Sequence, residues 1–291
     1  MIRVYYVPGY SITREYRLIQ QGLINNPRVE LVKTAKESDF VFQFYYRSKH
    51  KEHYKETFSP DKTVFIDYHD FPEWVSSIKC KAYFKRSWVV PAIRGYGVIK
   101  EPIKRPPNFY PLTFAIMDEF ITADNPKRDI WLTCPLRTKN RHHNRLRVLE
   151  TIDRMRIKGK TQIGEFNRGT MRAFNGSDMK EYFKMLKRSR IIVTCNPNPW
   201  EGDHRTWESF ASGALVFIDR MFTPLVHPLI DGKHCIFYDV SGPGFELLKE
   251  KIRHYIDNPA EAAVIAKEGY DFTMKYHRTT NRIDEILERI I

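Results

Sequence analysis

Short apolar runs alternate with amphipathic stretches along the whole chain. In the first half the apolar runs have the length of strands, and the stretch around residues 12–24 has the spacing of an amphipathic helix. The predicted strands there are residues 2–7, 29–32, 40–44, 64–67 and 82–84. Strands and helices that alternate in this way predict a parallel sheet with helices on both faces.

The pattern is interrupted at residues 95–127 and then starts again. Glycine and proline are frequent in this interval, as is typical of a connection (Gly95, Gly97, Pro102, Pro106, Pro107, Pro111). The second half predicts strands at residues 129–134, 161–163, 191–195, 215–219 and 235–238. It predicts helices at residues 144–155, 178–186, 206–212, 245–256, 259–275 and 279–290.

The two series of elements predict two domains. We expect an N-terminal α/β domain at residues 1–110, a C-terminal α/β domain at residues 111–275, and a terminal helix at residues 276–291 that packs back towards the first domain. A chain of 291 residues is long enough for each domain to bury its own core. The predicted fold class is α/β, with two Rossmann-like domains facing a cleft, which is a favoured place for a small-molecule site.

Cysteine usage and hydropathy narrow the class of protein. The four cysteines (Cys80, Cys134, Cys195, Cys235) are far apart and form no CxxC pair, so we expect free thiols and neither a zinc site nor a disulfide framework. No apolar run approaches the roughly 18 residues of a membrane span, and no signal peptide is recognisable. These features predict a cytoplasmic protein, with no membrane span.

The formal net charge of +13 suits several kinds of acidic partner. A nucleic acid, an acidic membrane surface and an acidic small substrate all have the required sign. The basic residues are spread over the chain, with the densest cluster at residues 137–147. Charge alone therefore does not choose among these partners.

The segment 191–219 carries the most informative pattern. It predicts a strand, a polar loop with a glycine, a helix, a capping Gly213 and a second strand. Arg205 and Glu208 lie three positions apart and so share a helix face near its N-terminus, where backbone N–H groups favour a diphosphate. Arg205 suits a phosphate and Glu208 suits two ribose hydroxyls. The alternative is a surface ion pair on an ordinary amphipathic helix.

The sequence from His204 to Phe217, HRTWESFASGALVF, resembles an element of GT-B glycosyltransferases, and is most similar to the exostosin-like and spore-coat-type groups. The resemblance continues through PLIDG at residues 228–232, CIFY at residues 235–238 and HYIDNPAE at residues 254–261. It covers roughly residues 128–291. The first half resembles the family mainly in the spacing of its predicted strands and in AYFKRS at residues 82–87. The compact plan is also similar to glycosyltransferases of large algal viruses, including a xylosyltransferase type.

The resemblance implies a transferase with a nucleotide-sugar donor, favours UDP as the nucleotide, and implies a glycan or glycoprotein acceptor. It implies that Arg205 contacts the pyrophosphate and Glu208 the ribose. The loop at residues 196–202 would lie beside the phosphates, together with the start of the helix (Asn196, Asn198, Gly202, His204, Thr206). Arg137 would be a second phosphate-binding residue or a solvated charge, while Arg141 and Arg145 are expected on a helix surface. The viral similarity implies xylose as the sugar and a host-cell cytoplasmic location.

The loop at residues 67–74, DYHDFPEW, is the candidate for acid–base chemistry. An inverting transferase needs a base for the acceptor hydroxyl, and we expect Asp70 in this role, with His69 second. Asp67 is nearer the strand and is expected to be structural. Tyr68 and Trp74 are candidates for contacts with the acceptor sugar. No DxD-type carboxylate pair is present, so arginine and the helix dipole would neutralise the leaving diphosphate without a metal. A retaining mechanism, in which Asp70 only binds the acceptor, stays open.

Two other functions fit parts of the sequence. A basic nucleic-acid-binding protein fits the charge, but no zinc finger, RNP-like motif or helix-turn-helix pattern is present, so we expect no nucleic-acid partner. A non-catalytic sugar-nucleotide-binding module, or an epimerase on the same scaffold, fits the fold. Neither GxGxxG after the first strand nor GxxxxGK[ST] occurs, which argues against other nucleotide-using families.

Overall fold

The structure is a computed structural model that describes residues 1–8, 13–45, 58–69, 74–88, 93–94, 97–98, 105–121, 123, 126–136, 143–164, 177–196 and 202–291. The chain divides into two compact units. The first comprises Met1–Met117, Phe222–Val226 and Arg278–Ile291, and the second comprises Asp118–Met221 and His227–His277. The first unit therefore extends to Met117, beyond the limit of residue 110 that the sequence predicted.

The first unit contains a parallel six-stranded sheet with the order β2-β1-β3-β4-β5-β8. Its strands are β1 (Ile2–Tyr6), β2 (Val29–Leu31), β3 (Phe40–Tyr45), β4 (Thr63–Asp67), β5 (Ala82–Lys85) and β8 (Phe109–Pro111). Every residue of β4 and β5 is buried, as expected for central strands covered on both faces. The sequence analysis missed β8, because Pro106, Pro107 and Pro111 favoured a connection. A short antiparallel pair, β6 (Ile93–Arg94) and β7 (Gly97–Val98), completes the strands described here.

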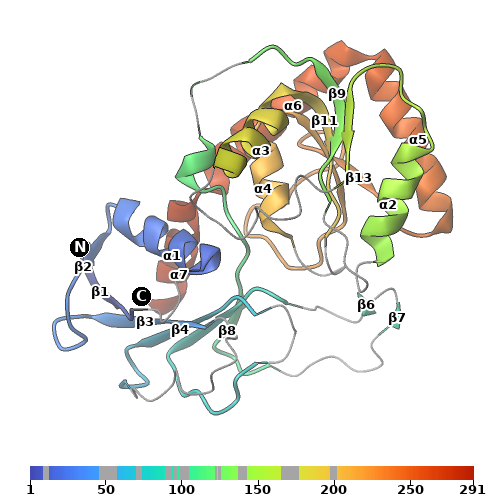
Figure 1. Cartoon of the computed structure of the whole chain (residues 1–291). Helices are drawn as coiled ribbons and strands as arrows, with labels where there is room; N and C mark the ends of the chain where they lie inside the picture. The colour runs from blue at the N-terminus through green and yellow to red at the C-terminus, as the bar shows by residue number, and fades with distance from the viewer. Residues whose placement is uncertain are drawn as a thin grey trace. The chain divides into compact units, whose positions relative to one another are not determined.

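Helices α1 (Arg14–Asn25) and α7 (Thr279–Ile290) pack together in the first unit (Figure 1). Thr13 caps α1 by accepting a hydrogen bond from the Tyr16 amide. A Cβ on Gly22 would lie 2.5 Å from the Thr279 carbonyl oxygen, so only glycine allows the two helices to approach this closely. The Asn26 side chain donates to Asp284 at 3.0 Å. The end of the chain is thus part of the first unit's core.

The second unit contains a parallel five-stranded sheet with the order β10-β9-β11-β12-β13. Its strands are β9 (Ile130–Cys134), β10 (Thr161–Ile163), β11 (Ser189–Val193), β12 (Leu215–Asp219) and β13 (Ile236–Tyr238). Its helices are the short 3₁₀ turn η1 (Asp118–Phe120), α2 (His143–Asp153), α3 (Ser177–Arg188), α4 (His204–Ala211), α5 (Gly242–Asp257) and α6 (Pro259–Tyr276).

Alternate residues of these strands form one continuous core with α2 and α5. Leu132, Val193 and Phe217 pack there with Val148 of α2 and Leu248 of α5. Helices α3 and α4 contact the same sheet, and in Figure 1 they lie on its other side. The predicted α/β class with parallel sheets is therefore confirmed. No helix among the described residues is long and apolar enough to cross a membrane.

Candidate functional site

Topology places a ligand site in the second unit. Counted in chain order, its strands follow the doubly wound order 2-1-3-4-5, and the order reverses between β9 and β11. In such sheets, ligands bind beyond the carboxyl ends of the strands at this reversal. Cys134 ends β9 and Val193 ends β11, and the segment after β11 leads directly into α4. Asn196, Gly202, His204 and Thr206 follow β11, so topology places these predicted donor residues at that edge.

Asp203 organises the start of α4. It is the N-cap residue, and its Oδ1 accepts a hydrogen bond from the Thr206 amide at 3.0 Å. Its Oδ2 lies 3.4 Å from a terminal nitrogen of Arg205. Burial opposes ionisation of Asp203, but Arg145, Arg205 and the Thr206 amide outweigh this cost and hold its pKa below the ordinary value. Asp203 therefore stays ionised and fixes Arg205 beside the helix terminus.

Arg145 is a further member of the site, and its predicted place on a helix surface is wrong. Its side chain reaches from α2 to Asp203 at 2.5 Å, and its Nε donates to the Cys195 carbonyl oxygen at 2.9 Å. Only 3% of the residue is exposed. A buried guanidinium needs partners of this kind, because an unpaired charge in the interior is costly. Arg145 thus joins α2, the segment after β11 and the N-terminus of α4.

Glu208 and Tyr182 form a second buried pair. The Tyr182 hydroxyl, on α3, donates to Glu208 Oε2 at 2.9 Å. Burial, with the adjacent Glu208 carboxylate, raises the pKa of Tyr182 well above its usual value, so its hydroxyl keeps its proton and remains a donor. Arg205 and Glu208 are both buried, which excludes the alternative of an exposed surface ion pair.

Asn196 and Asp219 connect the carboxyl ends of β11 and β12. The backbone amide of Asn196 donates to Asp219 Oδ1 at 2.7 Å, and its side-chain amide donates to the same oxygen at 2.9 Å. Burial raises the pKa of Asp219 to about 7, although these hydrogen bonds oppose the shift. An acid that titrates near neutral pH therefore lies at the edge of the sheet where ligands bind.

The positive end of α4 is less open than the sequence predicted. The Thr206 amide already donates to Asp203, and Thr206 itself is fully buried. Asp203 and Glu208 also balance the charges of Arg145 and Arg205. A diphosphate at this end would face the N-terminal end of the helix dipole and the half-buried His204.

In the first unit, the described residues of the loop at residues 67–74 differ in burial. Asp67 is buried and pairs with Lys85 at 3.0 Å, and it accepts a hydrogen bond from Tyr83 at 2.6 Å, as expected for a structural carboxylate. Tyr68 is fully buried with its hydroxyl on the Thr113 carbonyl oxygen, so its ring belongs to the core and is not exposed to an acceptor. The partly exposed residues are His69 and Trp74.

Three predicted site residues lie outside the described residues, namely Asp70, Arg137 and Asn198, and so does Arg141, which was expected on a helix surface. Gly202 is described: a Cβ there would lie 2.6 Å from the Met221 sulfur, so the close packing favours glycine. Within the described residues, no group of three or more His, Cys, Asp or Glu side chains is placed to hold a metal ion.

Sequence reasoning missed Arg145, Asp203, Tyr182 and Asp219. The role of Asp203 as the N-cap could have been predicted, because Asp is a preferred N-cap residue and Asp203 directly precedes the helix. The burial of Arg145 could not have been predicted, because nothing in its run of basic residues distinguishes the buried arginine from its exposed neighbours.

The arrangement defines a class: a two-unit α/β protein with a polar ligand site at the carboxyl edge of its second sheet, as in GT-B proteins. Similar structures agree with this class. HepE from Anabaena in complex with UDP matches with a TM-score of 0.56 and 10% identity, over 99% of each chain. A glycosyltransferase from Rickettsia africae matches with a TM-score of 0.59 and 10% identity, over 99% of this chain and 97% of that one. An alpha-glucosyltransferase in complex with UDP-glucose and abasic-site DNA matches with a TM-score of 0.57 and 10% identity, over 99% of each chain.

A family model described as glycosyl transferase-like matches residues 132–288, which is more than half of the chain. The protein belongs to this family, and it is a glycosyltransferase with the GT-B fold. No curated protein matches its sequence.

Proposed function

We propose that the protein transfers a sugar from a UDP-sugar to a glycan hydroxyl, with the donor held at the carboxyl edge of the second unit's sheet. The observation that carries this proposal is the buried cluster of Arg145, Asp203 and Arg205 at the start of α4. Buried charged groups are costly, and a cluster that fixes one guanidinium at a helix N-terminus suits an anionic ligand.

The choice of UDP rests on similar proteins. HepE has been solved with UDP and with UDP-glucose, and the alpha-glucosyltransferase with UDP-glucose. In our proposal, Arg205 contacts the diphosphate, while Glu208, held by Tyr182, accepts hydrogen bonds from the ribose hydroxyls. Arg145 acts through Asp203 as a positioning residue. Xylose remains our proposal for the donor sugar, on the resemblance to the viral transferases.

The proposed chemistry is a direct displacement with inversion. The acceptor oxygen attacks the anomeric carbon, the bond from that carbon to the phosphate oxygen breaks, and UDP leaves with the electron pair. Asp70 takes the proton of the acceptor hydroxyl, with His69 as the second candidate. Arg205 and the amides of the first turn of α4 stabilise the charge that develops on the diphosphate, in place of a divalent metal.

A thermal-shift screen of nucleotides and nucleotide-sugars tests this function. A ligand at 100 times its dissociation constant stabilises the native state by about 2.7 kcal/mol, which raises the melting temperature by several degrees. We expect UDP and UDP-sugars to raise it, with uridine as the control that lacks phosphate. The best donor is then tested for UDP release with glycan acceptors. Absence of any shift with all nucleotides would overturn the proposal, and donor binding without turnover would indicate a binding module.

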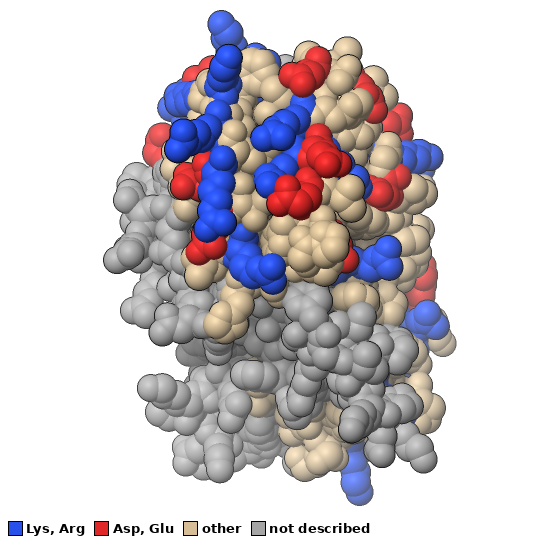
Figure 2. Space-filling model, turned by 90° about the vertical axis from the view of Figure 1, so that its right-hand side faces the viewer, with Lys and Arg blue, Asp and Glu red and all other residues tan. Residues whose placement is uncertain are grey.

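Nucleic acid is a second candidate partner. The formal net charge of +13 favours it, and one similar structure contains DNA. Against it, Asp and Glu side chains are interspersed among Lys and Arg on the described part of the face drawn in Figure 2. A duplex affinity that falls steeply with salt, without any nucleotide-sugar binding, would favour this alternative.

A further inference from the structure

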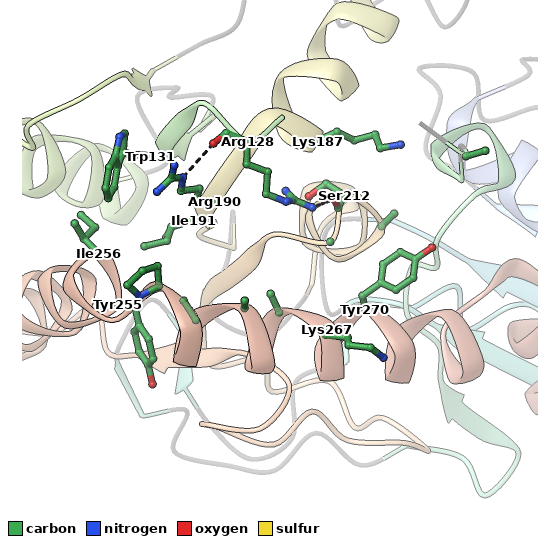
Figure 3. A pocket seen from close by; sticks show the side chains of 17 residues that line it. Arg128, Trp131, Lys187, Arg190, Ile191, Ser212, Tyr255, Ile256, Lys267 and Tyr270 are labelled. Carbon is green, nitrogen blue, oxygen red and sulfur yellow. Dashed lines mark hydrogen bonds between the residues drawn. The ribbon is translucent and has the colours of Figure 1, made fainter. Parts of the chain in front are cut away.

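A cavity of about 680 Å³ lies within the second unit (Figure 3), and none of the residues that line it is proposed to hold the donor. Arg190 and Ile191, near the start of β11, line it, whereas Asn196 follows the end of that strand. The last residue of α4, Ala211, also lines the cavity, whereas Arg205 stands near the first. A strand of five residues spans roughly 17 Å. The cavity is therefore at the opposite edge of the sheet from the donor site.

One wall of the cavity is a face of α6 that is apolar apart from Lys267, which pairs with Asp271. Ala262, Ala263 and Ala266 present small side chains from α6, and Tyr270 lies one turn further along the same helix. In Figure 3, Tyr255 and Tyr270 lie towards opposite ends of this face. The volume lies within the range of about 300–1,000 Å³ that is usual for small-molecule sites. This wall suits the apolar body of a ligand.

The wall across from α6 is basic. Arg128 donates to the Ser189 and Ser212 carbonyl oxygens, and Arg190 donates to the Arg128 carbonyl oxygen at 3.1 Å. The Arg190 guanidinium also stacks on Trp131, 4.2 Å from the ring centre. The residues that line the cavity include no Asp or Glu, and within the described part of the chain neither arginine forms an ion pair. Burial lowers the pKa of Arg128, and no neighbouring anion counters this effect.

A purely structural role accounts for Arg128 but not for the other features of this wall. Arg128 binds carbonyl oxygens at the C-terminal ends of α3 and α4, where a cation complements the helix dipoles. That role does not require Arg190, whose guanidinium stacks on Trp131 and lines the same space. Nor does it require a hollow opposite the alanine face. Two cations without a carboxylate partner and an apolar wall together favour an anionic ligand with an apolar part.

We propose that this cavity is a second binding site, which takes a small amphipathic anion. The apolar body of the ligand packs on the alanine face of α6, and its carboxylate or phosphate monoester accepts hydrogen bonds from Arg128 and Arg190. The ligand is either a soluble metabolite or the head and first carbons of a lipid, since both offer this chemistry. The site is independent of the proposed transferase function, because it shares no residue with the donor site.

Fluorescence titration with anilinonaphthalene sulfonate, an aromatic anion, tests the site on the whole chain of 291 residues. We expect binding at one site that excess UDP does not displace. Arg190→Gln keeps a polar side chain but shortens it and removes the charge, and should weaken binding about tenfold, as for the loss of a charged hydrogen bond. Arg253→Gln, at an exposed position of α5 that does not line the cavity, is the matched control and should bind normally.

A second variant separates the cavity from the rest of the surface. Ala263 is exposed on α6, so Ala263→Trp should fold normally while its indole fills the apolar wall and abolishes binding. If this variant fails to fold, the Arg190→Gln comparison decides. Displacement of the probe by UDP, or equal binding by wild-type protein and Arg190→Gln, would overturn the proposal.

Competition identifies the ligand chemistry. Octyl phosphate and octanoate should displace the probe, whereas inorganic phosphate and neutral octyl glucoside at the same concentration should not. Displacement by octyl glucoside as effective as that by octyl phosphate would show that charge is irrelevant and would overturn the anion assignment. Vesicles of phosphatidate in phosphatidylcholine distinguish the two sources: displacement by vesicles as well as by octyl phosphate indicates a lipid, and displacement by octyl phosphate alone indicates a soluble ligand.

Discussion

Arg145 and Asp203 are 58 residues apart in the sequence, and their side chains meet in a buried ion pair at 2.5 Å. Asp203 also caps α4 and contacts Arg205, while Arg145 binds the Cys195 carbonyl oxygen. One helix, the end of a central strand and the start of a second helix are thus held by a single charged contact. The position of Arg205 therefore depends on a residue from another part of the fold.

Replacing Arg145 should destabilise the protein. Arg145→Ala leaves Asp203 buried with one weaker partner, and loss of one member of a buried pair costs about 3–5 kcal/mol. Urea unfolding followed by circular dichroism measures this loss. Arg154→Ala, in the same helical region but with a 79% exposed side chain, is the control and should change stability by less than about 0.5 kcal/mol. A similar small effect for both variants would show that the buried pair does not organise the site.

The sequence predicted most of the helices and strands but not this contact. Strands β10 and β12 and helix α7 have the bounds that were predicted, because each has a clear apolar pattern between turn or capping residues. Strand β8 was missed, since it is short and its prolines are typical of loops. Arg205 and Glu208 were recognisable because their spacing is local. Arg145, Tyr182 and Asp219 were not, because their roles arise only when distant segments meet.

Asp219 should make stability depend on pH. Its pKa is about 7 in the folded protein against 3.8 ordinarily, so the folded state retains a proton that the unfolded state releases. Its contribution is complete below about pH 4 and is lost as pH rises to about 7, with an upper limit of about 4 kcal/mol. Asp219→Asn keeps an acceptor for Asn196 but cannot ionise. Its stability relative to wild type should therefore increase between pH 5 and pH 8.

Urea unfolding at several pH values measures this difference. Asp257→Asn, at an exposed position at the end of α5, is the control and should show no such trend. Parallel pH profiles for wild-type protein and Asp219→Asn would contradict a raised pKa for Asp219.

Arg205→Ala should weaken UDP binding. Loss of a charged hydrogen bond costs about 1.5–3 kcal/mol, which corresponds to an affinity roughly ten- to 150-fold lower. Calorimetry with UDP and with uridine separates the contact from a structural effect, because uridine lacks the diphosphate. We expect the loss for UDP only. Unchanged UDP affinity would refute the role of Arg205, and an equal loss for both ligands would assign it to structure alone.

Asp70→Asn should slow turnover strongly without weakening the donor complex. Asparagine keeps the size of the side chain and its ability to bind a hydroxyl, but it cannot take a proton. We expect a fall in kcat of at least about a hundredfold with an unchanged dissociation constant for UDP. His69→Gln is the companion variant, because His69 is the second candidate for the base. Full activity of Asp70→Asn together with loss in His69→Gln would move the base to His69.

Transfer should also continue in EDTA, because the proposed charge stabilisation comes from the protein. The departing diphosphate carries negative charge that a divalent ion neutralises in many phosphate-handling sites. Here Arg205 and the N-terminal end of the α4 dipole would supply the same stabilisation from fixed positions, and a chelator cannot remove them. UDP release is measured before and after dialysis against EDTA, with a metal-dependent transferase dialysed in parallel to show that chelation was complete. Activity that is lost and then restored by Mn²⁺ would contradict the metal-independent mechanism, and would require carboxylates from residues such as Asp70 or Glu73 to act as ligands rather than as a base.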